Sequence, residues 1–195
     1  MNKKEIKSAK TKEKLCNAFI ELYKEKPIEK ISVKEITDAA GYNRATFYIY
    51  YKDIYDVLES IENRLLQFYE TNLNNLVEGT LEKISPASFD FLKIITDFYH
   101  SNEKEFPILM TKDINFLNSV KKIAKQALLH RQSPVFFNDY GEIEYIIEYQ
   151  LSAVIGVLNA WIAKKQDISF EKLSALIFQM SKTGVLTTIN DKWNG

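Results

Sequence analysis

The sequence has little of what marks several classes of protein. Among its 195 residues it has one cysteine, Cys16, which excludes an intramolecular disulfide. The two histidines, His100 and His130, have no cysteine or carboxylate at a metal-ligand spacing, and there is no glycine loop of the kind that binds phosphate. A group of glutamates, Glu142, Glu144 and Glu148, is typical of a solvated helix face. We therefore expect no catalytic residues, no metal and no cofactor, and we expect that the protein is not an enzyme.

Glycine and proline are also scarce, with six and four residues. Apolar residues recur at the 3.6-residue period of a helix along most of the chain, and no convincing strand or repeat is found. The pattern predicts an all-α fold of about nine helices. We find no apolar stretch near the ~18–20 residues that span a bilayer, and the lysine-rich start has no hydrophobic signal region. We expect a cytoplasmic protein that does not bind membranes.

There is no excess of either charge, because 26 Lys and Arg balance 26 Asp and Glu. The balance argues against a protein that coats nucleic acid by bulk charge. Its distribution is uneven, however: residues 1–58 carry +3 and residues 59–195 carry −3. This asymmetry suits local contact with DNA, and solvated helix faces explain it equally well. The lysines between residues 3 and 14 either contact DNA or form a frayed, soluble tail.

The most informative segment is 31–58, which reads as two short capped helices hinged on one glycine. Ser32 and Glu35 stand in capping-box relation, so a helix begins near Val33 and ends before Gly41, which closes helices readily in the left-handed conformation. Asn43 is a good N-cap for a second helix. So short a connection makes the helices cross steeply, which is the pattern of a helix-turn-helix.

These residues resemble the tetracycline-repressor (TetR) family of transcriptional regulators. The resemblance rests on Ser32-Val33, on residues 36–41 (ITDAAG), on residues 44–48 (RATFY) and on residues 50–53 (YYKD). It implies a three-helix DNA-binding domain at 1–57 and a helical domain at 58–195 that binds an effector and dimerises. It further implies a dimeric, ligand-responsive repressor on a palindromic operator, and partners that are double-stranded DNA, a second copy and a small apolar or aromatic effector.

The second helix of a helix-turn-helix enters the major groove by its N-terminal end, which predicts that its first side chains lie nearest the bases. Tyrosine hydroxyls and lysines nearby suit phosphate oxygens. Arg44 is the candidate for base readout, with phosphate contact as the alternative. The predicted DNA-binding residues are Lys34, Tyr42, Asn43, Arg44, Thr46, Tyr48, Tyr50 and Lys52.

Two residues depart from the family pattern. Ile49 stands where a polar or basic residue is frequent, and Ile54 stands where a lysine commonly meets phosphate. Weaker binding to DNA is one interpretation, and packing of Ile54 against the C-terminal helical domain is another. The departures also favour an alternative function, a TetR-like protein that acts through protein contact with weak or no specific DNA binding.

Apolar side chains of the C-terminal part are either ordinary core or the lining of an effector pocket, and the resemblance favours a pocket. The predicted lining residues are Phe68, Phe91, Ile95, Phe98, Phe116, Tyr145 and Tyr149. Broad apolar faces on the last two helices indicate burial between subunits. The predicted dimer-interface residues are Ile155, Gly156, Ala160, Leu176 and Met180.

Overall fold

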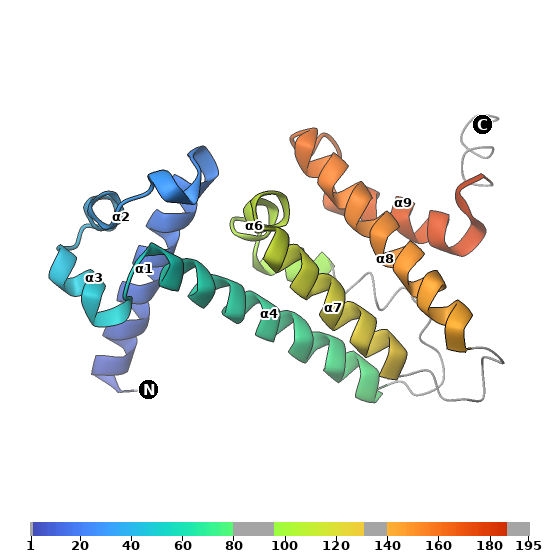
Figure 1. The fold of residues 1–195 in the computed structure, drawn as a ribbon, viewed down its shortest axis with the longest axis horizontal. Coiled ribbons are helices and arrows are strands. Elements are labelled where there is room, and N and C mark those ends of the chain that lie inside the picture. The colour runs from blue at the N-terminus through green and yellow to red at the C-terminus, as the bar shows by residue number, and fades with distance from the viewer. Residues whose placement is uncertain (1, 80–95, 131–139, 187–195) are drawn as a thin grey trace. The chain divides into compact units, whose positions relative to one another are not determined.

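A computed structural model describes residues 2–79, 96–130 and 140–186 of the chain. All regular elements in these ranges are helices, which confirms the predicted all-α fold (Figure 1). They are α1 (Lys3–Glu25), the 3-10 helix η1 (Ile28–Lys30), α2 (Val33–Ala40), α3 (Arg44–Tyr50), α4 (Ile54–Gly79), α6 (Phe106–Lys112), α7 (Ile114–His130), α8 (Tyr140–Ala163) and α9 (Phe170–Thr183), with a further helical segment at 96–101.

The chain divides into two compact units, Met1–Leu65 and Leu66–Gly195. The division falls inside α4, eight residues beyond the boundary predicted after residue 57, and the predicted functional division stays a prediction. Each unit has its own apolar core, so we describe the two separately.

Helix α1 begins at the third residue because Asn2 caps it. The Asn2 side chain accepts from the backbone N–H groups of Lys4 and Glu5 at 3.0 Å, and the Glu5 carboxylate accepts from the Asn2 N–H at 2.9 Å. The early lysines therefore lie on a helix rather than in a loose tail. Four of them are spaced by four, three and four residues and are all exposed, which places them along one stripe of α1: Lys3, Lys7, Lys10 and Lys14.

In the N-terminal unit, α2 packs against both α1 and α3. The apolar faces of α1 to α4 meet in a small core whose side chains are almost completely buried. Phe47 of α3 and Tyr51 lie in this core, with ring centroids 5.8 Å apart. The core fixes which side of α3 faces inward. Its fully buried members include Leu15, Phe19, Ile36, Phe47, Val57, Ile61 and Leu65.

In the C-terminal unit, α7 packs against α6 and α8, and α9 packs against α8. Asp113 caps α7 by accepting from the N–H groups of Asn115 and Phe116. Ser169 caps α9, because its hydroxyl accepts from the Lys172 N–H at 3.3 Å. Helix α9 ends at Thr183, and Gly184 follows with a φ of +87°.

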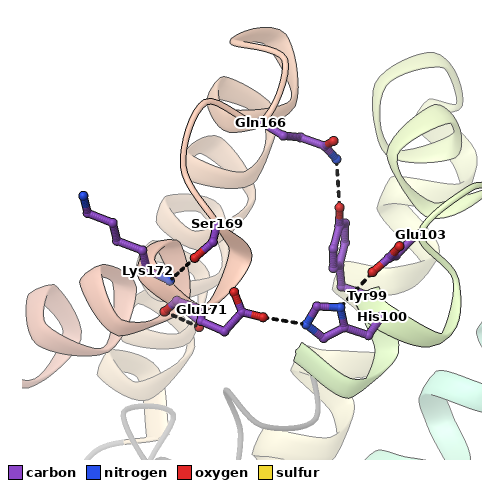
Figure 2. A network of polar contacts seen from close by, with 8 residues as sticks. Tyr99, His100, Glu103, Gln166, Ser169, Glu171 and Lys172 are labelled. Carbon is purple, nitrogen blue, oxygen red and sulfur yellow. Dashed lines mark hydrogen bonds and ion pairs between the residues drawn. The ribbon is translucent and has the colours of Figure 1, made fainter.

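The turn between α8 and α9 is held by the segment at 96–101 (Figure 2). Lys165 and Gln166 both have positive φ, near +58° and +59°, which is uncommon for residues other than glycine. The Gln166 side-chain amide donates to the Tyr99 hydroxyl at 2.9 Å, and the Tyr99 ring stacks on Phe170 with centroids 4.3 Å apart. These contacts fix the turn in its left-handed conformation.

Residues Glu144–Ala163 of α8 are long and apolar enough to cross a membrane by length and composition, contrary to the expectation from the sequence. The polar residues Glu148, Ser152 and Asn159 interrupt the segment, so no uninterrupted apolar run marks it. One side of the helix packs into the core of the C-terminal unit, which is the behaviour of a core helix. The buried residues on that side are Ile147, Leu151, Val154, Leu158 and Trp161.

Candidate nucleic-acid interface

The helix-turn-helix forms through the local interactions that the sequence predicts. The Ser32 hydroxyl accepts from the Glu35 N–H at 3.3 Å, and the Glu35 carboxylate accepts from the Ser32 N–H at 3.0 Å, which completes a capping box. Gly41 follows α2 with φ +73° and ψ +36°, in the left-handed region. The Asn43 side chain then accepts from the Thr46 N–H at 2.8 Å and caps α3.

An ion pair joins the start of α2 to the end of α1. Lys26 Nζ lies 2.6 Å from Glu35 Oε1, and its hydrogen bond, together with those from Ser32, lowers the pKa of the Glu35 carboxyl to about 2. Glu35 is therefore ionised at neutral pH and serves both the cap and the ion pair.

The outer face of α3 consists of four exposed residues. Phe47 points into the core, so Arg44, Ala45, Tyr48 and Ile49 face outward. Tyr48 is 59% exposed and Ile49 is 74% exposed. This surface, the α3 outer face, presents a guanidinium, a phenol and two apolar side chains.

The other predicted residues of α3 are less accessible. Asn43 is exposed, but its side-chain oxygen is used by the cap and by the Thr46 hydroxyl, 3.0 Å away. Thr46 is half-buried, and its hydroxyl is directed to this oxygen. Arg44 is therefore the best placed of the three for contact with a base edge.

Tyrosines at both ends of α3 lie under lysines of α1. Lys14 Nζ lies 5.8 Å from the centroid of the Tyr42 ring, and Lys12 Nζ lies 6.0 Å from the centroid of the Tyr50 ring. Both distances are within the range of cation–π attraction. Sequence reasoning predicted the tyrosines but not this pairing. No local pattern signals it, because each pair is brought together only by the packing of three helices.

The two remaining predicted lysines are exposed near the turns. Lys34 has its Nζ 3.8 Å from the Asp38 carboxylate on the same helix. Lys52 precedes α4, which Asp53 caps by accepting from the Tyr55 N–H at 2.9 Å. Ile54, the first residue of α4, is half-buried, whereas Ile49 points to solvent.

The lone cysteine lies beneath this interface. Cys16 Sγ is 3.2 Å from the hydroxyl of Tyr51; Cys16 is half-buried and Tyr51 is buried. Burial, followed by the contact with Cys16, raises the pKa of the Tyr51 phenol. The pair is a packing contact of the core rather than a reactive site.

The C-terminal unit contains a cavity of about 40 Å³. Of the predicted pocket residues, Phe98 lines it. Its lining also includes residues that sequence reasoning missed, most of which are inward-facing side chains of α6, α7 and α8, with Tyr69 from α4. The complete lining is Tyr69, Phe98, Phe106, Met110, Val120, Lys121, Ala124, Leu151, Val154, Ile155 and Leu158.

The other predicted pocket residues that the structure describes do not line this cavity. Phe68 stacks on Phe98 with centroids 6.0 Å apart and is partly exposed, while Phe116 is buried in the core elsewhere. Tyr145 and Tyr149 are 80% and 67% exposed, because they lie on the side of α8 opposite its buried stripe. Phe91 and Ile95 lie outside the described residues.

The predicted dimer-interface residues lie on two helices. Ile155 lines the cavity, so it belongs in part to the unit's own core. Gly156 and Ala160 are exposed on α8, and Leu176 and Met180 are half-buried on α9. A methyl group added at Gly156 would meet nothing within 4 Å of the single chain.

The described parts of the chain hold no group of three His, Cys, Asp or Glu side chains arranged for a metal ion. His100 has carboxylates at both ring nitrogens, Glu103 at 2.8 Å from Nδ1 and Glu171 at 3.0 Å from Nε2 (Figure 2). Since carboxylates only accept, both contacts are hydrogen bonds when the ring is an imidazolium.

Residues 15–61 match the family model described as bacterial regulatory proteins, tetR family. No curated protein matches the chain. The fold is similar to that of the fatty acid degradation regulator FadR from Bacillus halodurans, with a TM-score of 0.64 and 15% identity over 87% of this chain and 93% of that one. It is also similar to a TetR transcriptional regulator from Streptococcus agalactiae 2603V, with a TM-score of 0.59 and 21% identity over 91% and 96% of the two chains.

The structural likeness extends over both units, although at these identities it concerns the fold alone. The family match covers α2, α3 and the capped turns that carry the exposed residues described above. The protein thus carries the N-terminal helix-turn-helix domain of the bacterial regulatory proteins of the tetR family.

Proposed function

We propose that the protein is a sequence-specific DNA-binding regulator of transcription that acts in the cytoplasm as a dimeric, ligand-responsive repressor on a palindromic operator. The observation that carries this proposal is the α3 outer face, where Arg44 stands exposed within a segment that matches the tetR family. The lysine–tyrosine pairs at both ends of α3 support it, because they supply cations and hydroxyls for phosphate oxygens.

In this proposal the side chains divide by role. Arg44 binds a base, since its planar fork matches guanine O6 and N7, while Asn43 and Thr46 stand beside it. Phosphate contacts fix the register of the protein on the duplex. They come from the flanking residues Lys34, Tyr42, Tyr48, Tyr50 and Lys52.

Selection from a pool of random-sequence duplex DNA tests the proposal. The purified full-length protein is expected to enrich a palindromic motif whose half-sites lie about 34–36 Å apart or a multiple of that distance. Arg44→Ala is expected to lose ~1–3 kcal/mol of discrimination at one base position. Arg64→Ala, an exposed arginine of α4 outside the turn, is the matched control. An Arg44→Ala protein that keeps every base preference would contradict the role of Arg44.

Dimerisation through α8 and α9 is part of the proposal. It is supported by the exposed apolar side chains of α8, which include Tyr145 and Tyr149 beside the small residues Gly156 and Ala160. Sedimentation equilibrium measures the assembly. Ala160→Glu is expected to shift the protein toward monomer and to weaken operator binding, whereas Ala39→Glu on α2 leaves the oligomeric state unchanged.

The effector is proposed to be apolar, because the lining of the cavity is almost entirely apolar. A volume of about 40 Å³ has room for about three water molecules, so a larger ligand displaces side chains as it enters. Ala124→Val fills this space and is expected to abolish the rise in melting temperature that an apolar effector produces. Ala163→Val, on the exposed end of α8, is the control.

A second candidate function is regulation through protein contact, with the helix-turn-helix repurposed. The exposure of Ile49 favours it, since a protein partner would cover an apolar side chain there. The selection experiment separates the two functions. Absence of any enriched motif, together with a stable protein complex isolated from cells, would support the second.

A further inference from the structure

The α3 outer face has one feature that phosphate and guanine contacts do not use. Ile49 is 74% exposed and is the most exposed large apolar side chain among the described residues of the N-terminal unit. Ala45 precedes it by four residues and is exposed as well. Residues four apart on a helix lie on the same side with their Cβ atoms about 5–6 Å apart. The two side chains therefore form a small apolar strip next to Arg44.

Such a strip has one chemical match in the major groove. Among the groups that base pairs present there, the C5-methyl of thymine is apolar, whereas the others are hydrogen-bond donors and acceptors. The strip cannot hydrogen-bond to those groups. An amide or guanidinium at residue 49 would read a donor–acceptor pattern, but isoleucine reads a methyl group by contact.

The surroundings of the strip favour DNA over a protein partner. Exposed lysines lie on α1, at the start of α2 and before α4; Lys12 and Lys14 lie over tyrosines at the two ends of α3, so cations flank the strip, while Lys34 is paired with Asp38. Two side chains also make a smaller apolar patch than protein interfaces bury at their centre. A polyanion with an isolated apolar group fits this combination of charges and shape.

We propose that Ile49, with Ala45, reads the methyl group of a thymine in each half-site, close to the guanine that Arg44 binds. Ile49 is then a specificity-determining residue. Isoleucine in place of the polar residue frequent at this position changes which base is preferred and does not weaken the binding of DNA. The inference rests on the proposed DNA-binding function.

Removing single methyl groups from the DNA tests this proposal. In the enriched motif, each thymine is replaced in turn by deoxyuridine, which lacks only the C5-methyl, and binding to the wild-type protein and to Ile49→Ala is measured. One buried methyl corresponds to about a fourfold change in affinity. We expect about fourfold weaker binding of the wild type at one thymine per half-site, and no further loss at that position for Ile49→Ala.

The control is Ile6→Ala, the same change at an exposed isoleucine of α1, which keeps the wild-type sensitivity to deoxyuridine. If cytosine is accepted in place of that thymine, 5-methylcytosine there is expected to bind the wild-type protein more tightly than unmethylated cytosine does, because it carries the same C5-methyl group. Equal deoxyuridine effects for the wild type and Ile49→Ala, or none for the wild type, would overturn the inference and leave the proposed function intact. Absence of any enriched motif would overturn both.

Discussion

The left-handed glycine between α2 and α3 allows a quantitative prediction for Gly41→Ala. Gly41 has φ +73° and ψ +36°, and a Cβ built on it would meet nothing within 4 Å. The cost of alanine is therefore that of the backbone conformation alone, ~1–2 kcal/mol. Alanine also lowers the entropy of the unfolded chain, which offsets ~0.5 kcal/mol. We expect a net loss of about 1 kcal/mol in the stability of the turn, or about fivefold more frequent opening.

Amide hydrogen exchange, followed by mass spectrometry, measures this opening by region. Peptides that cover residues 31–51 should exchange about fivefold faster in Gly41→Ala, while those from α8 and α9 should be unchanged. Gly41→Asn should lose less, since asparagine tolerates the left-handed region better than alanine. An unchanged rate in Gly41→Ala would refute a left-handed turn. A loss of more than ~3 kcal/mol in the stability of the turn in Gly41→Ala would show that the added Cβ meets other atoms.

Gly156→Ala is the matched control, because a Cβ there also meets nothing within 4 Å but the residue lies inside α8. Alanine in a helix interior stabilises by ~0.5–1 kcal/mol relative to glycine. The same substitution is thus expected to have opposite signs at the two sites. Faster exchange in α8 of this variant would instead indicate close packing against a second copy.

Three further predictions concern stability. The hydrogen bond to Glu103, with that to Glu171, raises the pKa of His100. The two ion pairs therefore stabilise the fold fully at a pH below the ordinary pKa of histidine, and this stabilisation is lost as the pH rises through the raised pKa. His100→Gln should therefore lower the free energy of unfolding by ~0.2–1 kcal/mol at pH ~5.5 and have little effect at pH ~9, measured by urea unfolding, because the three side chains are largely exposed; a pH-independent loss would contradict the ion pairs. Phe98→Ala should cost ~3–5 kcal/mol in the C-terminal unit, seen in tryptophan fluorescence, since Phe98 packs against several rings in the core; a loss below ~1 kcal/mol would argue against that burial. Ser32→Ala should lose ~1 kcal/mol in α2 by hydrogen exchange, and Ser32→Asp should keep the cap; equal losses in both would exclude capping as the cause.

The parts of the fold that were predicted correctly are those that local chemistry decides. Ser32, Gly41 and Asn43 each act on backbone groups within four residues, so their roles are visible in the sequence. The start of α1 at residue 3 also has a local cause, the reciprocal bonds of Asn2 and Glu5, but the lysine-rich composition concealed it.

The features that were not predicted depend on which side of a helix packs against a neighbouring helix. Helix α8 is apolar on most of its circumference, so periodicity could not assign Tyr145 and Tyr149 to the exposed side. The contact between His100 and Glu171 joins residues 71 positions apart, and no spacing rule reports it. Likewise, the sequence offered Lys12 and Tyr50 separately, and only the packed helices bring them together.

The four-lysine stripe of α1 gives salt two opposite effects on this protein. Like charges three or four residues apart repel one another, at a cost of ~0.2–0.5 kcal/mol per pair, and ions screen that repulsion over about 10 Å at 0.1 M salt. Added salt therefore strengthens α1 in the free protein, whereas it weakens any attraction of Lys3, Lys7, Lys10 and Lys14 to a phosphate backbone. At low ionic strength the repulsion among the four lysines is not screened, and a bound polyanion would neutralise it. Binding and folding of this helix therefore support each other most at low ionic strength.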